Sequence, residues 1–169
     1  MKQFKILLSY IVTTLIMFSL FQSKHHNDDD ELMKHDKSTP FLSVAGNHYR
    51  AKVVYIYDGD TMHVVFKEFG KYFRWNCRIM NVDTPELRTK NEKEKELGYK
   101  VRDILREKFQ DKIVIVETYD FDKYGRLLID VLFKDDSGRL IKLSDWLINN
   151  KYAYQYGGGT KSDMYKNMK

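Results

Sequence analysis

Five short segments rich in β-branched and aromatic residues alternate with turn-forming residues along the chain, and one helical pattern interrupts them. Asp-Gly at residues 58–59 lies between the first two segments, and this dipeptide is a strong signal for a β-hairpin. The sequence therefore predicts strands at Tyr49–Tyr57, Thr61–Phe66, Phe73–Met80, Ile113–Thr118 and Arg126–Phe133.

Strands of this number and order favour an all-β fold with flanking helices (α+β). We expect a five-stranded Greek-key barrel of the OB type with about two packed helices. An open antiparallel sheet with a helix on one face would give the same pattern.

Two helices are expected beside the strands. Residues Glu96–Phe109 carry an apolar stripe at helical spacing, although Gly98 weakens this helix by up to ~1 kcal/mol relative to alanine. Ser144 is expected to cap a short helix that ends at Asn150. The tail from Tyr152 to Lys169 is expected to lie along the surface.

Residues 1–23 are expected to form a signal peptide or an uncleaved signal anchor. Lys2 and Lys5 precede the apolar run Ile6–Phe21, whose length does not decide between the two. The missing Ala-x-Ala-like cleavage site favours the anchor. Either alternative predicts a secreted or membrane-anchored protein, with its domain on the extracytoplasmic side.

A polar, acidic linker is expected at residues 24–45, followed by a folded domain at residues 46–160 and a C-terminal tail at residues 161–169. Residues 1–45 contain equal numbers of basic and acidic side chains, so the formal charge of +5 belongs to the rest of the chain. A basic domain favours a polyanionic partner, such as nucleic acid or an anionic membrane.

The segment from Cys77 to Glu86 combines the end of a strand with a turn that is rich in charge. Pro85 fixes its own φ angle and pushes Thr84 out of the helical region, so the turn is stiff. Asp83 and Glu86 are therefore expected to lie close together.

Such a turn suits phosphodiester hydrolysis, which needs carboxylates for a hard cation, a base for water and cationic donors for the phosphate. Arginine fits the last role because its planar fork binds phosphate through two donors and stays charged. The chain supplies all of these types in Asp60, Arg78, Asp83, Glu86 and Arg126.

Three motifs in this order resemble the staphylococcal-nuclease-like (thermonuclease) family. They are Tyr-Asp-Gly-Asp-Thr at residues 57–61, Arg-x-x-x-Val-Asp-Thr-Pro-Glu at residues 78–86 and Asp-Lys-Tyr-Gly-Arg at residues 122–126. The resemblance covers roughly Tyr49 to Thr160. It implies an OB-fold nuclease that cleaves DNA and RNA with Ca²⁺.

The resemblance also implies roles for single residues. Asp60 and Asp83 would supply carboxylate ligands to Ca²⁺ and Thr84 its backbone carbonyl, while Asp58 would reach the metal shell through water. Glu86 would act as the general base. The remaining roles concern the substrate: Arg78 and Arg126 would hold the phosphate and Tyr124 would border the nucleotide pocket.

The main alternative is a catalytically silent OB-fold module that binds nucleic acid or protein. A degraded module would be expected to have lost some of the five charged site residues, and all five are present, which favours the enzyme. The tail tyrosines, Tyr152, Tyr154 and Tyr156, do not align cleanly with the family pattern and receive no role. We expect the protein to be a monomer.

Overall fold

The computed structural model describes residues 2–157 of the chain. It divides into two compact units, Met1–Leu42 and Ser43–Lys169. The predicted tail at residues 161–169 lies outside the described residues.

The first unit is built on one long helix, α1 (Lys2–Leu32). This helix includes the first part of the segment predicted as a polar linker at residues 24–45. Among residues 2–157, none of the helices combines the length and the apolar character that crossing a membrane requires. A signal peptide or anchor at residues 1–23 stays a prediction.

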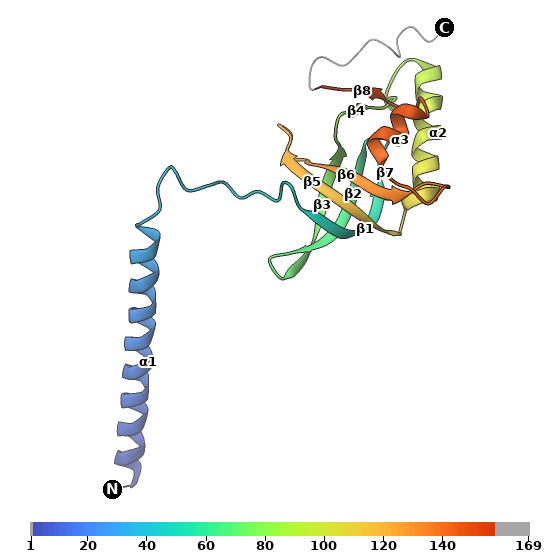
Figure 1. Ribbon diagram of the computed structural model, residues 1–169. Helices are drawn as coiled ribbons and strands as arrows, with labels where there is room; N and C mark the ends of the chain where they lie inside the picture. The colour runs from blue at the N-terminus through green and yellow to red at the C-terminus, as the bar shows by residue number, and fades with distance from the viewer. Residues whose placement is uncertain (1, 158–169) are drawn as a thin grey trace. The chain divides into compact units, whose positions relative to one another are not determined.

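The second unit contains a closed five-stranded β-barrel with helices packed beside it (Figure 1). Antiparallel pairs join neighbours in the order β3-β2-β1-β5-β6, and a parallel pairing of β3 with β6 closes the circle. This closure confirms the predicted OB-type barrel and excludes the open sheet. The barrel strands are β1 (His48–Ile56), β2 (Thr61–Glu68), β3 (Lys71–Ile79), β5 (Ile113–Phe121) and β6 (Leu127–Lys134).

Alternate side chains of the barrel strands point inward and form the core. Met62, Val64 and Phe66 of β2 are buried, and their neighbours along the strand are not. Burial raises the pKa of the Cys77 thiol to about 12, as expected for a small core residue. Alternation in the sequence predicts that Phe73, Trp75, Cys77 and Ile79 of β3 face the core, but Phe73 lies near the hairpin end of the strand and is 42% exposed.

Helix α2 (Glu92–Phe109) begins four residues earlier than predicted. The side chain of Asn91 accepts hydrogen bonds from the backbone N–H groups of Lys93 and Glu94, at 3.1 and 3.2 Å. This N-cap starts the helix inside a charged run that has no apolar periodicity, and Glu92 and Glu94 then lie favourably in its first turn.

Helix α3 (Leu143–Asn149) is the second predicted helix, but Ser144 does not cap it. The Ser144 hydroxyl and backbone N–H both donate to the buried carboxylate of Asp130, so the serine ties α3 to β6. Strand β7 (Leu140–Lys142) leads into this helix and pairs with β6.

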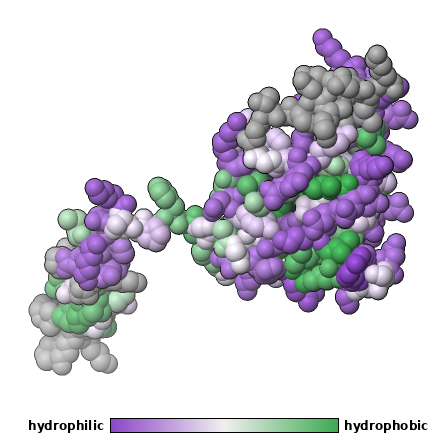
Figure 2. All heavy atoms as spheres, turned by 45° about the horizontal axis from the view of Figure 1, so that its top comes forward, coloured by the Kyte–Doolittle hydropathy of each residue, from purple (hydrophilic) through white to green (hydrophobic). Residues whose placement is uncertain are grey.

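A second, very small sheet forms next to the barrel. Strand β4 (Val82–Asp83) pairs with β8 (Tyr154–Gln155), and Ala153 is buried. Of tail residues 152–157, Ala153 is buried and the others are partly or fully exposed, so this part of the tail lies at the surface and also forms a strand that the sequence did not predict. Hydrophilic side chains cover most of the face of the barrel unit that Figure 2 shows.

Gly98 is a packing residue of α2 rather than a weakness in it. A Cβ atom at this position would lie 2.9 Å from the backbone oxygen of Pro85 and 3.1 Å from a methyl group of Leu87. Glycine therefore lets the helix approach the turn that contains Asp83 and Glu86.

We expect Gly98→Ala to lower the free energy of unfolding by about 1–3 kcal/mol, because a backbone atom stands where the methyl group must go. Helix propensity alone predicts the opposite sign, a gain of up to ~1 kcal/mol. Urea unfolding followed by circular dichroism measures the difference. Lys100→Ala, at an exposed position of the same helix, is the control and should change little. A stabilised Gly98→Ala variant would contradict the packing role.

Candidate active site

The turn between β1 and β2 presents one of the predicted carboxylates. The Asp58 carboxylate accepts hydrogen bonds from the backbone N–H groups of Asp60 and Thr61, at 3.1 and 2.8 Å, and so shapes the turn. The Thr61 hydroxyl donates to Asp60 Oδ1 at 2.8 Å. Asp60 is only 4% exposed, so its carboxylate is held in one position.

Arg78, near the end of β3, connects the predicted acidic residues. Its Nη1 lies 2.6 Å from Asp60 Oδ2, and its Nη2 lies 3.8 Å from Asp83 Oδ1. Nη2 also donates to the backbone oxygen of Val82 at 3.0 Å. Asp60, Arg78 and Asp83 thus come together as the sequence predicts.

The turn from Asp83 to Glu86 is fixed from three sides. β8 pairs with β4 on one side, and the backbone N–H of Glu86 donates to Glu94 of α2 at 3.2 Å. On the third side a Cβ atom at Gly59 would lie 2.8 Å from two carbon atoms of the Thr84 side chain. The two turns that carry Asp60 and Asp83 are therefore in contact, and only glycine fits at their junction.

Negative charge exceeds positive charge in this cluster. Burial, followed by the nearby charge of Asp60, raises the pKa of Asp58 to about 6. The three carboxylates of Asp58, Asp60 and Asp83 carry more negative charge than the single guanidinium of Arg78, which contacts Asp60 and Asp83, can offset. An added cation would therefore be electrostatically favoured here.

The oxygen donors of this cluster fit a hard cation. Asp60 and Asp83 offer buried carboxylates and Thr84, 3% exposed, adds a backbone carbonyl, all of which are oxygen ligands of the type that Ca²⁺ takes. Within residues 2–157, no group of three or more His, Cys, Asp or Glu side chains is arranged to hold a metal ion. A Ca²⁺ ion bound here would need the carbonyl, water and substrate oxygens to complete its ligand shell.

Arg126 lies immediately before β6, whose parallel pairing with β3 sets Leu128 opposite Arg78. Arg126 itself lies outside the strand, and its described contacts are with Asp122 and Tyr124 rather than with Asp60, Arg78 or Asp83. Arg126 Nε lies 2.7 Å from Asp122 Oδ2. Burial alone would raise the pKa of the Asp122 carboxyl, but hydrogen bonds from Arg126 and Tyr124 lower this pKa below its usual value. The Tyr124 ring lies 5.6 Å from the Arg126 guanidinium carbon and is 73% exposed.

Sequence reasoning missed Tyr156. Its ring centre lies 5.8 Å from the guanidinium carbon of Arg78, and its backbone N–H donates to Asn81 at 2.8 Å. The only sequence feature that pointed to Tyr156 is the tyrosine-rich composition of the tail. The pairing of β8 with β4 brings that tail to the site, and this pairing has no sequence pattern.

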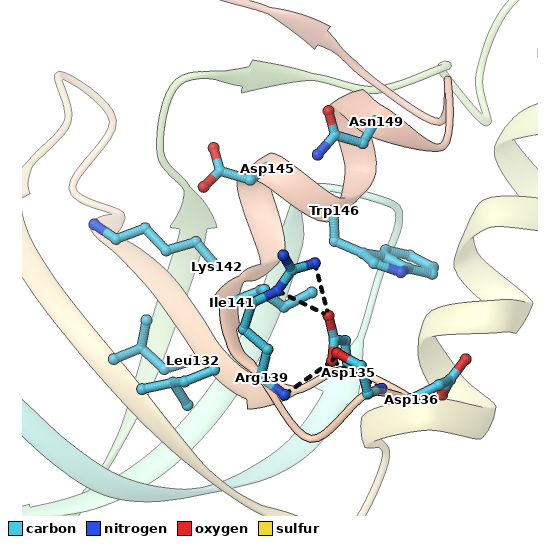
Figure 3. A pocket seen from close by; sticks show the side chains of 11 residues that line it. Leu132, Asp135, Asp136, Arg139, Ile141, Lys142, Asp145, Trp146 and Asn149 are labelled. Carbon is cyan, nitrogen blue, oxygen red and sulfur yellow. Dashed lines mark hydrogen bonds and ion pairs between the residues drawn. The ribbon is translucent and has the colours of Figure 1, made fainter.

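A hollow of about 890 Å³ lies elsewhere, between the β6–β7 hairpin and α3 (Figure 3). Two of its charged residues, Arg139 and Asp135, form an ion pair at 3.1 Å. None of the predicted site residues lines this hollow. We therefore place the candidate active site at Asp60, Arg78 and Asp83, where the predicted groups meet.

Comparison with known proteins identifies the family of the chain. The family described as "Staphylococcal nuclease homologue" matches residues 76–169, which include the predicted site residues except Asp58 and Asp60. A protein of Methanocaldococcus jannaschii, named uncharacterized protein MJ1439, is 31% identical over 177 aligned positions. That alignment covers 92% of this chain and 83% of the relative.

We expect Arg78→Met to lower the free energy of unfolding by about 3–5 kcal/mol, because it leaves two buried carboxylates without their common cation. Adding Asp60→Asn should recover part of this loss, since one of the buried charges is then removed. Thermal or urea unfolding of the two single variants and the double variant gives the coupling free energy between Arg78 and Asp60. Strictly additive losses would show that the contact between Arg78 and Asp60 contributes nothing to stability.

Proposed function

Because the chain belongs to the staphylococcal nuclease homologue family, we propose that it is a Ca²⁺-dependent nuclease that hydrolyses phosphodiester bonds in DNA and RNA. The observation that carries the proposal is the cluster in which Arg78 lies within 2.6 Å of Asp60 and 3.8 Å of Asp83. Buried acids and a nearby arginine at the meeting point of two turns provide charges of both signs for a metal ion and a phosphate.

Asp60, Asp83 and the Thr84 carbonyl would hold the Ca²⁺ ion. When bound there, the ion would polarise the phosphate and offset its negative charge. The Thr61 hydroxyl orients the Asp60 carboxylate, and the two-pair β4–β8 ladder positions the backbone at Asp83.

Glu86 is the proposed general base. The Glu86 side chain is exposed, whereas the preceding Pro85 is buried. The backbone N–H of Glu86 donates a hydrogen bond to the side chain of Glu94. A carboxylate on a fixed backbone that faces solvent can accept a proton from a water molecule and place its oxygen for attack.

Arg78 and Arg126 are the proposed phosphate ligands. A guanidinium has five N–H donors, and the described contacts of Arg78 with Asp60, Val82 and Asp83 do not use all of them. Arg126 directly precedes Leu127, which pairs with Cys77 next to Arg78, and this proximity supports a role for both arginines in stabilising charge on one phosphate. Exposed Tyr124 would border the nucleotide.

The alternative is an OB-fold module that binds nucleic acid or protein without turnover. It predicts binding without hydrolysis and no need for metal. The cluster of buried acids favours the enzyme, because binding of a polyanion gains nothing from negative charge at its centre.

We expect the full-length protein to hydrolyse single-stranded DNA and RNA with Ca²⁺ and to lose this activity with a chelator, because the phosphate needs a cation beside Asp60 and Asp83. Asp60→Ala should remove most of the activity at any Ca²⁺ concentration. Release of acid-soluble nucleotides measures both effects. Asp136→Ala, in the exposed turn after β6, is the matched control. Binding without cleavage by a folded protein, whatever the metal, would support the silent module instead.

Glu86→Gln should lower kcat by about 10²–10⁴-fold, because an amide cannot take a proton from water. Binding of an oligonucleotide should change little, since the arginines are intact. Single-turnover hydrolysis and fluorescence anisotropy separate the two quantities. Glu107→Gln, on the exposed face of α2, should behave like the wild type. Unchanged kcat in Glu86→Gln would remove Glu86 from the mechanism.

A further inference from the structure

The turn between β2 and β3 projects from the barrel and has an unusual conformation (Figure 1). Glu68 pairs with Lys71, so only Phe69 and Gly70 lie between the two strands. The φ angles of these two residues are 47° and 77°. Two positive φ angles in a two-residue loop are the mark of a type I′ turn, which favours asparagine followed by glycine.

Phe69 is a costly residue at this position. A bulky side chain at positive φ strains the backbone, and the ring of Phe69 is also 64% exposed. Neither the turn nor the core therefore accounts for a phenylalanine here. Because strained residues cluster at functional positions, the ring is a candidate for contact with a partner outside the chain.

Further aromatic rings belong to the same end of the barrel. Tyr72 is 75% exposed and Phe73 is 42% exposed. Phe121 of β5, 45% exposed, extends this surface through Trp75, whose ring centre lies 6.3 Å from those of Phe73 and Phe121. We call residues 67–74, none of which is buried, the β2–β3 tip.

The β2–β3 tip also carries unpaired cations. Lys67, Lys71 and Arg74 are exposed, and none of the three has an ion-pair partner within residues 2–157. The acid of the tip is Glu68, which faces Tyr49: burial, followed by the hydrogen bond with Glu68, raises the pKa of that tyrosine. The tip thus presents three cations against one anion.

Exposed rings beside unpaired cations match the surface of an anionic bilayer. Aromatic side chains favour the boundary between lipid headgroups and acyl chains, and basic side chains are attracted to anionic headgroups. The β2–β3 tip has both features on one projecting turn.

The position of the β2–β3 tip favours a membrane over nucleic acid as its partner. Lys71 begins β3 and Arg78 lies near its end, a separation of about 23 Å along an extended strand. A bilayer held at the tip would therefore leave the candidate active site open to solution.

We propose that the β2–β3 tip inserts into the interface of an anionic phospholipid bilayer. Phe69 and Tyr72 enter the boundary of the acyl chains, and Lys67, Lys71 and Arg74 contact the headgroup phosphates. This goes beyond the proposed nuclease function and does not depend on it. The tip is an attachment point within the folded unit, separate from the signal peptide or anchor predicted at residues 1–23.

The test places a probe on the β2–β3 tip of the full-length protein, so that lipid binding by residues 1–23 does not decide the result. Lys71→Cys would be labelled with the environment-sensitive dye NBD, which leaves the buried Cys77 unreacted. Vesicles of phosphatidylglycerol and phosphatidylcholine in equal parts should shift the emission to the blue. Pure phosphatidylcholine or added salt should reduce the shift, because the headgroup attraction is electrostatic.

A label at Asp136→Cys is the positional control. Asp136 is exposed in the turn after β6, and β6 runs parallel to β3, so its far end points away from the β2–β3 tip. The emission of this label should stay unchanged.

Phe69→Asn separates membrane binding from stability. It creates the Asn-Gly pair that a type I′ turn favours, so the midpoint of urea unfolding should rise. Loss of the ring should raise the vesicle concentration that gives half of the tip shift by about tenfold.

The cations are tested by a second variant in the labelled protein. Lys67→Gln/Arg74→Gln should raise the same vesicle concentration roughly 25-fold, since each cation contributes about fivefold. Lys100→Gln/Lys134→Gln removes the same charge from exposed positions on α2 and β6 and should have no effect.

Several results would overturn the inference. They are no shift of the tip label with phosphatidylglycerol vesicles, an equal shift at Asp136→Cys, an undiminished lipid response in Phe69→Asn, and a shift produced by an oligothymidylate but not by vesicles. Hydrolysis enters none of these measurements, so they give the same answer whether or not the protein is a nuclease.

Discussion

The contact between one guanidinium and two buried carboxylates is the constraint on which the site depends. Asp60 and Asp83 are 4% and 5% exposed, and a buried carboxylate without a partner is costly. Arg78 meets both from a third segment of the chain. The β1–β2 turn, the end of β3 and the β4 turn must therefore all be in place for any of these charges to be tolerated.

Barrel closure holds these segments in register. β3 is antiparallel to β2 on one side and parallel to β6 on the other. The first pairing sets Thr61 opposite Arg78, next to Asp60, and the second sets Leu127, which follows Arg126, opposite Cys77. Gly59 and Gly98 complete the arrangement from outside, because each allows an approach to the Asp83–Glu86 turn that a larger residue would block.

The sequence predicted what depends on periodic patterns and on motifs. Alternation identified the barrel strands, and the motifs around the Asp-Gly hairpin and the Pro85 turn singled out Asp60, Arg78 and Asp83 as site residues. The start of α2 was missed because Asn91 caps it within a charged run, and β4 and β8 were missed because two-residue strands have no periodicity. Tyr156 could not be placed for the same reason. Gly98 was judged by its helix propensity, whereas its tertiary contact decides its role.

The small β4–β8 sheet gives the site a mobility of its own. The barrel pairs along strands of eight or nine residues, whereas β4 and β8 meet through two residue pairs only. Local opening of so short a ladder costs far less than global unfolding, so it occurs within the native ensemble. Each opening would release the backbone of Asp83 while Asp60 stays fixed in the barrel. The two carboxylates thus belong to cooperative units of different stability, and hydrogen exchange at Tyr156, whose backbone N–H donates to Asn81, would be faster than in the barrel strands.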